Sequence, residues 1–113
     1  MELSNIANEV AELHAGICSA LADTRRILIL YVLAERRLSV SDLAQEIGIT
    51  QPAASRHLKH LRERDLVLPE RNGSVVEYRL TDHRLIEALD ILRTVLYDRI
   101  THRASLFDIE EAS

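Results

Sequence analysis

The pattern of apolar and polar positions along the chain predicts helices on both sides of one short alternating segment. In the segment 3–21, apolar residues recur at every third or fourth position, at Ile6, Val10, Leu13 and Ile17. This spacing predicts a helix with a narrow apolar seam. The next segment, from Asp23 as the expected N-cap to about Ala34, is apolar on nearly all sides and predicts a central core helix.

Two further helices are predicted close together in the next part of the chain. The first begins at a serine cap, Ser39 or Ser41, and carries an apolar stripe at Val40, Leu43, Ala44 and Ile47. Gly48 fits the position just past its end, and Thr50 fits the N-cap of the second helix, whose first turn tolerates Pro52. A short helix, a tight turn and a second helix form a helix-turn-helix.

The second of these helices has two different faces. The apolar face is formed by Ala54, Leu58 and Leu61. His57 lies at the edge of this face, where we expect it to pack against the core, whereas His60 is expected to be solvated. The opposite face is polar and basic, with Pro52, Ser55, Arg56 and Lys59 at its centre and Gln51 and Arg62 beside it. We expect the apolar face to pack on the core and the basic face to enter a DNA major groove.

The alternating segment follows directly and predicts a β-hairpin. The pair Asn72-Gly73 is a strong hairpin signal, because both residues of a tight type I′ turn adopt positive φ. The strand after the turn alternates with polar residues and has its apolar positions at Val76, Tyr78 and Leu80. Pro69 suits an edge strand or a bulge. A two-stranded hairpin after a helix-turn-helix is a wing.

A long last helix is predicted over residues 82–103, with Thr81 as its cap. Its apolar seam is formed by Leu85, Leu89, Leu92, Leu96 and Ile100. The first and last helices offer more apolar surface than so small a core needs, so we expect them to form a homodimer interface. The residues expected in this interface are Ile6, Val10, Leu13, Ile17, Leu89, Leu92, Leu96 and Ile100.

The expected fold class is mainly α with a small β-hairpin. It is a winged helix-turn-helix of five helices with a two-stranded wing, and it forms a homodimer through the first and last helices. Residues 1–103 are expected to make one DNA-binding and dimerisation domain. Residues 104–113 are expected to be a disordered tail.

The distribution of charge along the chain indicates a polyanion as a candidate partner. The 113 residues carry a formal net charge of −4, but residues 49–80 hold six Arg/Lys and four Asp/Glu. A basic region on an acidic body is typical of a protein that binds a polyanion, and the alternative is a solvated surface without a partner. No apolar segment approaches the roughly 20 residues of a membrane span, no secretory signal is visible, and one cysteine cannot form an internal disulfide. These features favour the cytoplasm.

This order of elements resembles the ArsR/SmtB family of winged-helix bacterial transcriptional repressors over about residues 10–100. The segment "TQPAASRHL", residues 50–58, follows the family pattern Ser-Gln-x-x-x-Ser-x-His-Leu. "YRLTD" at residues 78–82 also matches, and "ADTR" at residues 22–25 matches except that it lacks the family's proline before the threonine. The resemblance implies a homodimer that binds a pseudo-palindromic operator in double-stranded DNA.

The resemblance also implies which residues contact DNA. Gln51, Ser55 and Arg56 occupy base-contacting positions, which suits the ability of Gln to bind adenine and of Arg to bind guanine. Pro52 replaces the family's commoner serine and brings no hydrogen-bond donor. Lys59 and two wing residues, Arg71 and Ser74, are expected to contact phosphate.

The metal sites known in the family are not retained. Ser39-Val40-Ser41 stands where one site has Cys-x-Cys, and serine is a poor ligand for the soft metals bound there. In the second site, Arg84 and Val95 replace the two histidines. We therefore expect no metal and no other cofactor. A different metal site could be formed by His14, Cys18 and His102. The alternative is that these residues bind no metal and are a half-buried thiol and an interfacial histidine.

Cys18 also raises the possibility of redox sensing. A lone cysteine cannot close an intrachain disulfide, which leaves an intersubunit disulfide or a sulfenic acid. The alternative is a buried, inert cysteine.

The sequence favours a DNA-binding transcriptional regulator, most simply a homodimeric repressor released from its operator by a signal that the sequence does not identify. The alternative is a winged-helix module for protein interaction without specific DNA contact. An enzyme is not expected, because the chain has no glycine-rich phosphate loop and no evident pair of nucleophile and base.

Overall fold

The computed structural model describes the backbone of residues 2–112 and the side chains of residues 2–106. The chain divides into two compact units, one ending at Asp82 and the other beginning at His83. The second unit is a single long helix, α5 (Arg84–Ala112). In the part of the chain that the structure describes, no helix is long and apolar enough to cross a membrane.

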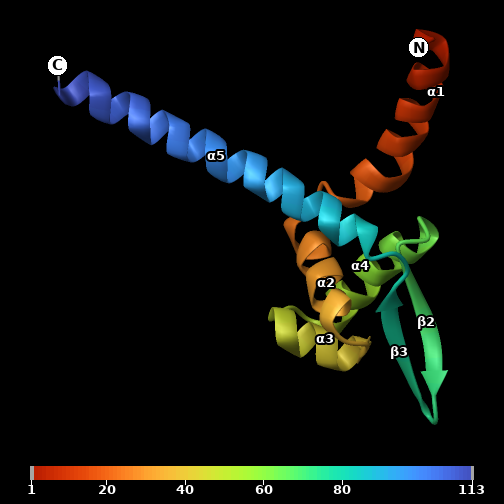
Figure 1. The fold of residues 1–113 in the computed structure, drawn as a ribbon. Helices are drawn as coiled ribbons and strands as arrows, with labels where there is room; N and C mark the ends of the chain where they lie inside the picture. Colours follow the sequence, from red (N-terminus) through yellow and green to blue (C-terminus); the bar gives the residue numbers. More distant parts are fainter. Residues whose placement is uncertain (1, 113) are drawn as a thin grey trace. The chain divides into compact units, whose positions relative to one another are not determined.

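The first unit contains the elements predicted for the helix-turn-helix and the wing (Figure 1). It also contains two elements that the sequence pattern did not predict. In chain order the elements of this unit are α1 (Leu3–Leu13), the π-helical segment η1 (His14–Cys18), α2 (Thr24–Glu35), β1 (Leu38–Ser39), α3 (Val40–Ile47), α4 (Gln51–Glu63), β2 (Val67–Asn72) and β3 (Val75–Leu80). Helices α2, α3 and α4 pack against one another and against the hairpin.

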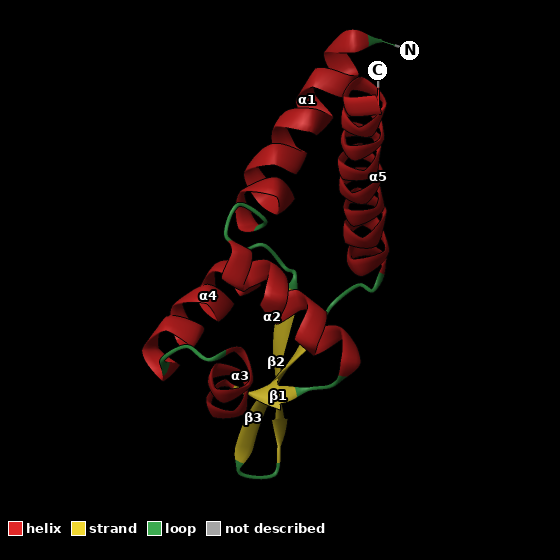
Figure 2. Cartoon of the chain, turned by 90° about the vertical axis from the view of Figure 1, so that its left-hand side faces the viewer, coloured by secondary structure: helices red, strands yellow, loops and turns green. Residues whose placement is uncertain are grey.

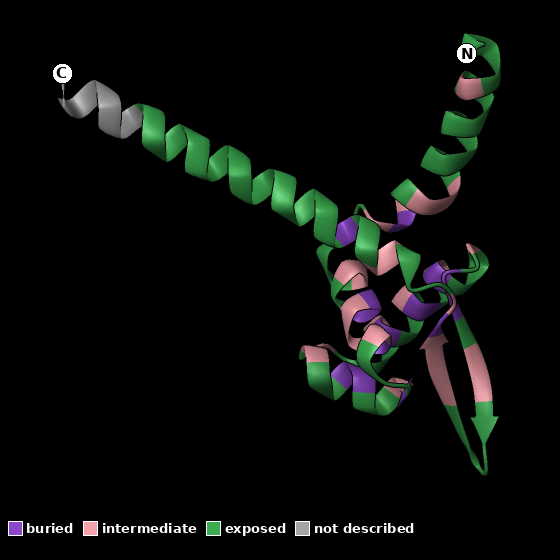
Figure 3. Cartoon of the chain, viewed as in Figure 1, coloured by how far each residue is buried: buried purple, intermediate pink, exposed green. Residues whose placement is uncertain are grey.

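The core of the first unit lies between these helices and the base of the sheet (Figure 3). Its largest fully buried side chains are Ile29, Leu30, Leu43, Leu58, Leu61 and Val67. The prediction that α2 is a core helix is confirmed by Ile29 and Leu30. However, Leu28 is 47% exposed, so α2 is not buried on all sides.

The first helix departs from α-helical geometry near its end. It was predicted to continue as an α-helix to about Leu21, but α1 gives way to the π-helical η1 after Leu13. The Ser19 hydroxyl donates a hydrogen bond to the Ala15 carbonyl at 2.7 Å. A side-chain hydroxyl that competes for a backbone acceptor disturbs regular helical hydrogen bonding. The spacing of apolar residues does not indicate this change of helix type.

The sheet has three antiparallel strands in the order β1-β3-β2 (Figure 2). The hairpin β2–β3 is the predicted wing, and Pro69 lies on the edge strand β2, as expected for a residue without an N–H donor. Strand β1 was not predicted, because two residues are too short to show alternation. It pairs Leu38 with Tyr78 and Ser39 with Glu77, and thereby ties the wing to the start of α3.

The hairpin turn lies one residue later than predicted. Asn72 pairs with Val75, so the turn residues are Gly73 and Ser74. Gly73 has φ +67°, which fits a type II′ turn, where only the first turn residue needs positive φ. Asn72 belongs instead to β2, and its side-chain amide donates a hydrogen bond to Glu77 Oε1 at 3.0 Å.

Thr81 does not cap α5, contrary to prediction. Its hydroxyl donates a hydrogen bond to the Asp65 carbonyl at 2.7 Å, and its backbone N–H donates to the Leu66 carbonyl at 3.1 Å. Thr81 therefore joins the end of β3 to the loop after α4. The last helix begins at Arg84 rather than at Asp82.

Helix α5 is longer than predicted and carries a large exposed apolar surface. It continues past Arg103 to Ala112. Between Asp90 and Leu106 every side chain is exposed, whereas Leu89 is only 6% exposed. The predicted tail, residues 104–113, lies partly outside the described residues, and its disorder stays a prediction.

Candidate nucleic-acid interface

The turn between α3 and α4 is fixed by its own hydrogen bonds. Gly48 ends α3 with φ +80°, and the N–H groups of Gly48 and Ile49 both donate to the Ala44 carbonyl, at 2.9 and 3.0 Å. Thr50 then caps α4, because its hydroxyl accepts a hydrogen bond from the Ala53 N–H at 3.2 Å. The cap of α3 is Ser39, whose hydroxyl accepts from the Asp42 N–H at 3.1 Å. The predicted helix-turn-helix is thus confirmed with its caps.

Helix α4 is anchored by one face and exposes the other. Ala54, Leu58 and Leu61 are each 0% exposed, as predicted. The side chains on the opposite face are all exposed: Gln51, Pro52, Ser55, Arg56, Lys59 and Arg62. Because the apolar face holds the helix in the core, the exposed face has a fixed orientation. A helix of this kind can present its polar face to a groove.

The cations on this exposed face are not neutralised within the chain. Arg56, Lys59 and Arg62 make no ion pair in the part of the chain that the structure describes. Several basic residues elsewhere in the first unit are paired, as Arg36 is with Glu46 at 3.1 Å. Unpaired cations along one helix face favour contact with a polyanion.

The C-terminal end of α4 is held by a network that the sequence pattern did not predict. Arg64 donates a hydrogen bond from Nε to the Ser19 hydroxyl at 2.9 Å, and from Nη1 to the His60 carbonyl at 3.1 Å. Arg26 donates to the carbonyls of Ala20 at 2.7 Å and Ser19 at 3.2 Å. The segment that follows η1 is therefore bonded to both α2 and the end of α4.

His60 lies beside this network and is not solvated as predicted. The residue is half-buried, but its Nε2 atom is buried and has no hydrogen-bond partner among the described residues. Burial of the ring lowers the pKa of His60 below its ordinary value of 6.5, and the nearby charges of Arg26 and Arg64 lower it further. The other histidine of α4, His57, is half-buried.

Asp23 caps α2, as predicted, next to this end of the helix-turn-helix. Its carboxylate accepts a hydrogen bond from the Arg25 N–H at 2.8 Å. This hydrogen bond lowers the pKa of Asp23, and the charge of His57 also lowers it while partial burial opposes both. The cap therefore stays ionised as it holds the start of α2.

The wing presents its two faces differently. Cross-strand partners lie on the same face of a sheet, so Arg71 shares a face with Val76, and Glu70 shares the other face with Glu77. Arg71 and Ser74 are both exposed. Arg71 makes no ion pair in the described part of the chain, so its charge remains available to a ligand.

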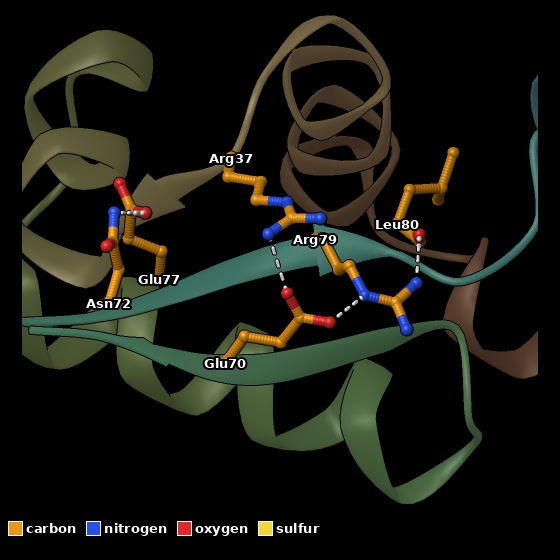
Figure 4. A network of polar contacts seen from close by, with 6 residues as sticks. All are labelled: Arg37, Glu70, Asn72, Glu77, Arg79 and Leu80. Atoms are coloured by element: carbon orange, nitrogen blue, oxygen red, sulfur yellow. Dashed lines mark hydrogen bonds and ion pairs between the residues drawn. The ribbon is translucent and has the colours of Figure 1, made fainter.

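A polar network crosses the Glu70 face of the sheet (Figure 4). The Glu70 carboxylate binds Arg37 through one oxygen, at 2.7 Å, and Arg79 through the other. The hydrogen bond from Arg79 lowers the pKa of Glu70, partial burial opposes this, and the charges of Arg37 and Arg79 lower it further. Glu70 is therefore ionised and holds two guanidinium groups.

Cys18 is exposed rather than buried, which corrects the expectation of a half-buried or buried thiol. It belongs to η1, where the π-helical turn follows a helix without buried residues. Among the described residues, no group of three or more His, Cys, Asp or Glu side chains is placed to hold a metal ion. The assignment of His14, Cys18 and His102 to a site is not tested by the single chain.

The sequence analysis did not identify three residues with a clear structural role, namely Arg64, Ser19 and Glu70. Arg64 and Ser19 are 45 positions apart, and no local pattern connects them. The ion pair between Glu70 and Arg37 could not be predicted either, because Arg37 precedes strand β1, which was itself not predicted. The exposed face of α4, in contrast, follows from helical spacing within one element.

Comparison with known proteins identifies the family to which this chain belongs. Residues 23–68 match the model of the family described as bacterial regulatory protein, arsR family. The chain is 34% identical over 91 residues to the nodulation protein NolR of Rhizobium meliloti, covering 80% of this chain and 75% of that protein.

Solved structures agree in fold. The transcriptional repressor BigR from Xylella fastidiosa superposes with a TM-score of 0.71 at 32% identity, over 84% of this chain and 96% of that chain. A homodimeric winged helix-turn-helix DNA-binding domain from Mycobacterium bovis, solved by NMR in solution, gives a TM-score of 0.73 at 25% identity. That match covers 90% of this chain and 93% of the domain.

Proposed function

Since the chain belongs to the arsR family of bacterial regulatory proteins, we propose that it is a homodimeric repressor that binds a pseudo-palindromic operator in double-stranded DNA. It is a transcriptional regulator and not an enzyme. The proposal includes release from the operator by a signal that is not identified, and action in the cytoplasm, where bacterial DNA is found.

The observation that carries this proposal is the exposed, unpaired basic face of α4 above a fully buried anchor. Arg56 and Lys59 lie on this face, while Leu58 between them is 0% exposed. A rigidly held helix with unneutralised cations is suited to a major groove, because the groove admits one helix and the phosphates on its edges attract the cations.

The residues on this face divide by chemistry into two groups. Gln51, Ser55 and Arg56 carry donors and acceptors that fit base edges, and Arg binds guanine O6 and N7 with two hydrogen bonds. Lys59, Arg71 and Ser74 suit phosphate, which positions the protein without specifying the sequence. Pro52 has no side-chain donor, so at its position we propose only apolar contact.

The proposed homodimer explains the apolar residues that the single chain leaves exposed. Val10 is 52% exposed on α1, and Leu92 is 59% exposed on α5. Exposed apolar surface of this extent marks an interaction site, and the related domain from M. bovis is homodimeric. The proposed interface residues are Ile6, Val10, Leu13, Ile17, Leu89, Leu92, Leu96 and Ile100, of which Leu89 is already largely buried in the single chain.

Matched substitutions on α4 test the proposal. Arg56→Ala should weaken binding to a specific site by about 1–3 kcal/mol and relax the choice of base at one position. Lys59→Ala should weaken binding to all sequences alike, and should reduce the slope of log affinity against log salt by about 0.9. Fluorescence anisotropy on DNA from upstream of the protein's own gene measures both.

An unchanged affinity in the Arg56→Ala variant would contradict base contact by α4. The remaining interpretation would then be a winged-helix module for protein interaction, which needs the buried face of α4 but no base-contacting residues. Circular dichroism of both variants controls for the fold.

A further inference from the structure

The arginines of the sheet region differ in whether they are paired. Arg71, on the wing, makes no ion pair in the described part of the chain. Arg37 and Arg79 both bind Glu70, which uses one carboxylate oxygen for each (Figure 4). Arg79 also donates from Nη1 to the Leu80 carbonyl at 3.4 Å. The difference lies in the acidic partner and not in the residue type.

The paired arginines are accessible enough to bind a ligand if they were released. The Arg37 side chain is 59% exposed and the Arg79 side chain is 34% exposed. Glu70 immediately precedes Arg71 in β2, so the paired cations lie at an adjacent position of the wing but on the opposite face from the free one. Charges within about 10 Å of a phosphate act on it at ordinary ionic strength.

We propose that Glu70 limits binding to DNA of arbitrary sequence by holding the guanidinium groups of Arg37 and Arg79 away from phosphate. The inference rests on the proposed DNA-binding function and names a residue that sets the strength of its sequence-independent part. Each further cation on phosphate strengthens binding to every sequence equally, whereas base contacts strengthen binding to one sequence. Removing two cations from phosphate contact therefore weakens binding to DNA of every sequence, so that base contacts supply a larger share of the binding energy that remains.

The chain supplies a matched control for this role. Glu77 lies directly opposite Glu70 in the sheet, on the same face. It accepts a hydrogen bond from the Asn72 amide at 3.0 Å, and no arginine is paired with it in the described part of the chain. Glu70→Gln and Glu77→Gln thus remove the same charge at neighbouring positions, but only the first releases two arginines.

The test is binding to a random-sequence duplex, measured by anisotropy over a range of salt concentrations. We expect Glu70→Gln to bind about two- to fivefold more tightly than Glu77→Gln at low salt, the range of a surface ion-pair energy. Its salt slope should be steeper by about 0.9 for each released guanidinium that reaches phosphate. Adding Arg37→Gln to Glu70→Gln should remove part of this gain.

Equal affinities and slopes for the two variants, or a weaker affinity for Glu70→Gln, would overturn the proposal. A second variant keeps the test valid if Glu70→Gln fails to fold. In the otherwise unchanged chain, Arg37→Gln should leave the salt slope on random DNA as it is, whereas a slope reduced by about 0.9 would show that Arg37 already contacts phosphate. If the unaltered protein binds no DNA at all, the proposed function fails before this inference is reached.

Discussion

At the scale of single residues, the polar side chains that stabilise the first unit are either local caps or parts of long-range networks. Asp23, Ser39 and Thr50 each accept a hydrogen bond from an N–H two or three residues later. Such caps stabilise a helix end by about 1 kcal/mol. Arg64 instead spans 45 residues to reach Ser19, and it connects the end of α4 to the segment after η1.

The lowered pKa of His60 predicts that the stability of the fold depends on pH. Its pKa is lowered in the folded chain, so the unfolded chain binds more protons below its ordinary value of 6.5. Stability is therefore full above that value and falls as the pH drops through it towards the folded pKa. One group contributes a slope of at most about 1.4 kcal/mol per pH unit.

The measurement is urea unfolding of the protein and of His60→Gln between pH 5 and 8. The free energy of unfolding of the unaltered protein should fall more steeply with acid than that of the variant. Parallel curves would show that the buried Nε2 atom of His60 does not determine the pH dependence.

What the sequence could predict at this scale depends on distance along the chain. The caps were predictable because donor and acceptor lie within three residues of each other. The partners of Arg64 and Glu70 were not, because they become neighbours only after the helices and the sheet have packed. His60 was also misassigned: its Nε2 atom is buried, near the charge of Arg26 on another helix.

At the scale of elements, the helix-turn-helix depends on the geometry of one glycine. Gly48 has φ +80°, a conformation that L-residues with a side chain adopt at a cost. An added Cβ would meet no atom within 4 Å, so the cost of a substitution there is backbone strain and not a clash. This turn sets the direction of α4 relative to α3.

Gly48→Ala should therefore lower the free energy of unfolding by about 1 kcal/mol. Gly16→Ala is the matched control, since an added Cβ at Gly16 also meets no atom within 4 Å and Gly16 lies in the helical η1. There, alanine should be neutral or stabilising by up to about 1 kcal/mol. Thermal or urea unfolding of both variants makes the comparison, and equal effects would refute the role of positive φ at Gly48.

The order of the elements was predictable, but several of their ends were not. Apolar spacing determined α2, α3 and α4 because each buries a continuous stripe. The hairpin turn lies one residue later than predicted, and the Asn72 side chain bonds to Glu77 in the sheet. Strand β1 is two residues long, so its pairing with β3 is visible only in three dimensions.

At the scale of the whole molecule, α5 presents apolar side chains that a single chain does not cover. Leu92, Leu96 and Ile100 are each more than half exposed, at 59%, 56% and 55%. Apolar surface of this kind is stabilised by burial, at roughly 25 cal/mol for each Å². The seam on α5 was predictable from its spacing, whereas the extension of the helix to Ala112 was not.

Leu92→Asp should dissociate the proposed dimer and abolish specific DNA binding together, because a carboxylate would be buried without a partner. Thr94→Asp introduces the same charge two residues later, on a different side of the helix, and should leave the dimer intact. Sedimentation velocity of both variants tests this. A Leu92→Asp protein that keeps the dimer mass would contradict the assigned interface.

In the proposed function, two copies of α4, held at a fixed separation by the dimer, bind a specific DNA sequence. The most direct test is to select bound duplexes from a random-sequence library and sequence them. We expect enrichment of an inverted repeat whose half-site centres are about 10 bp, or a multiple of it, apart. A selected pool that remains random would contradict specific binding, and an enriched site without a repeat would contradict the dimer.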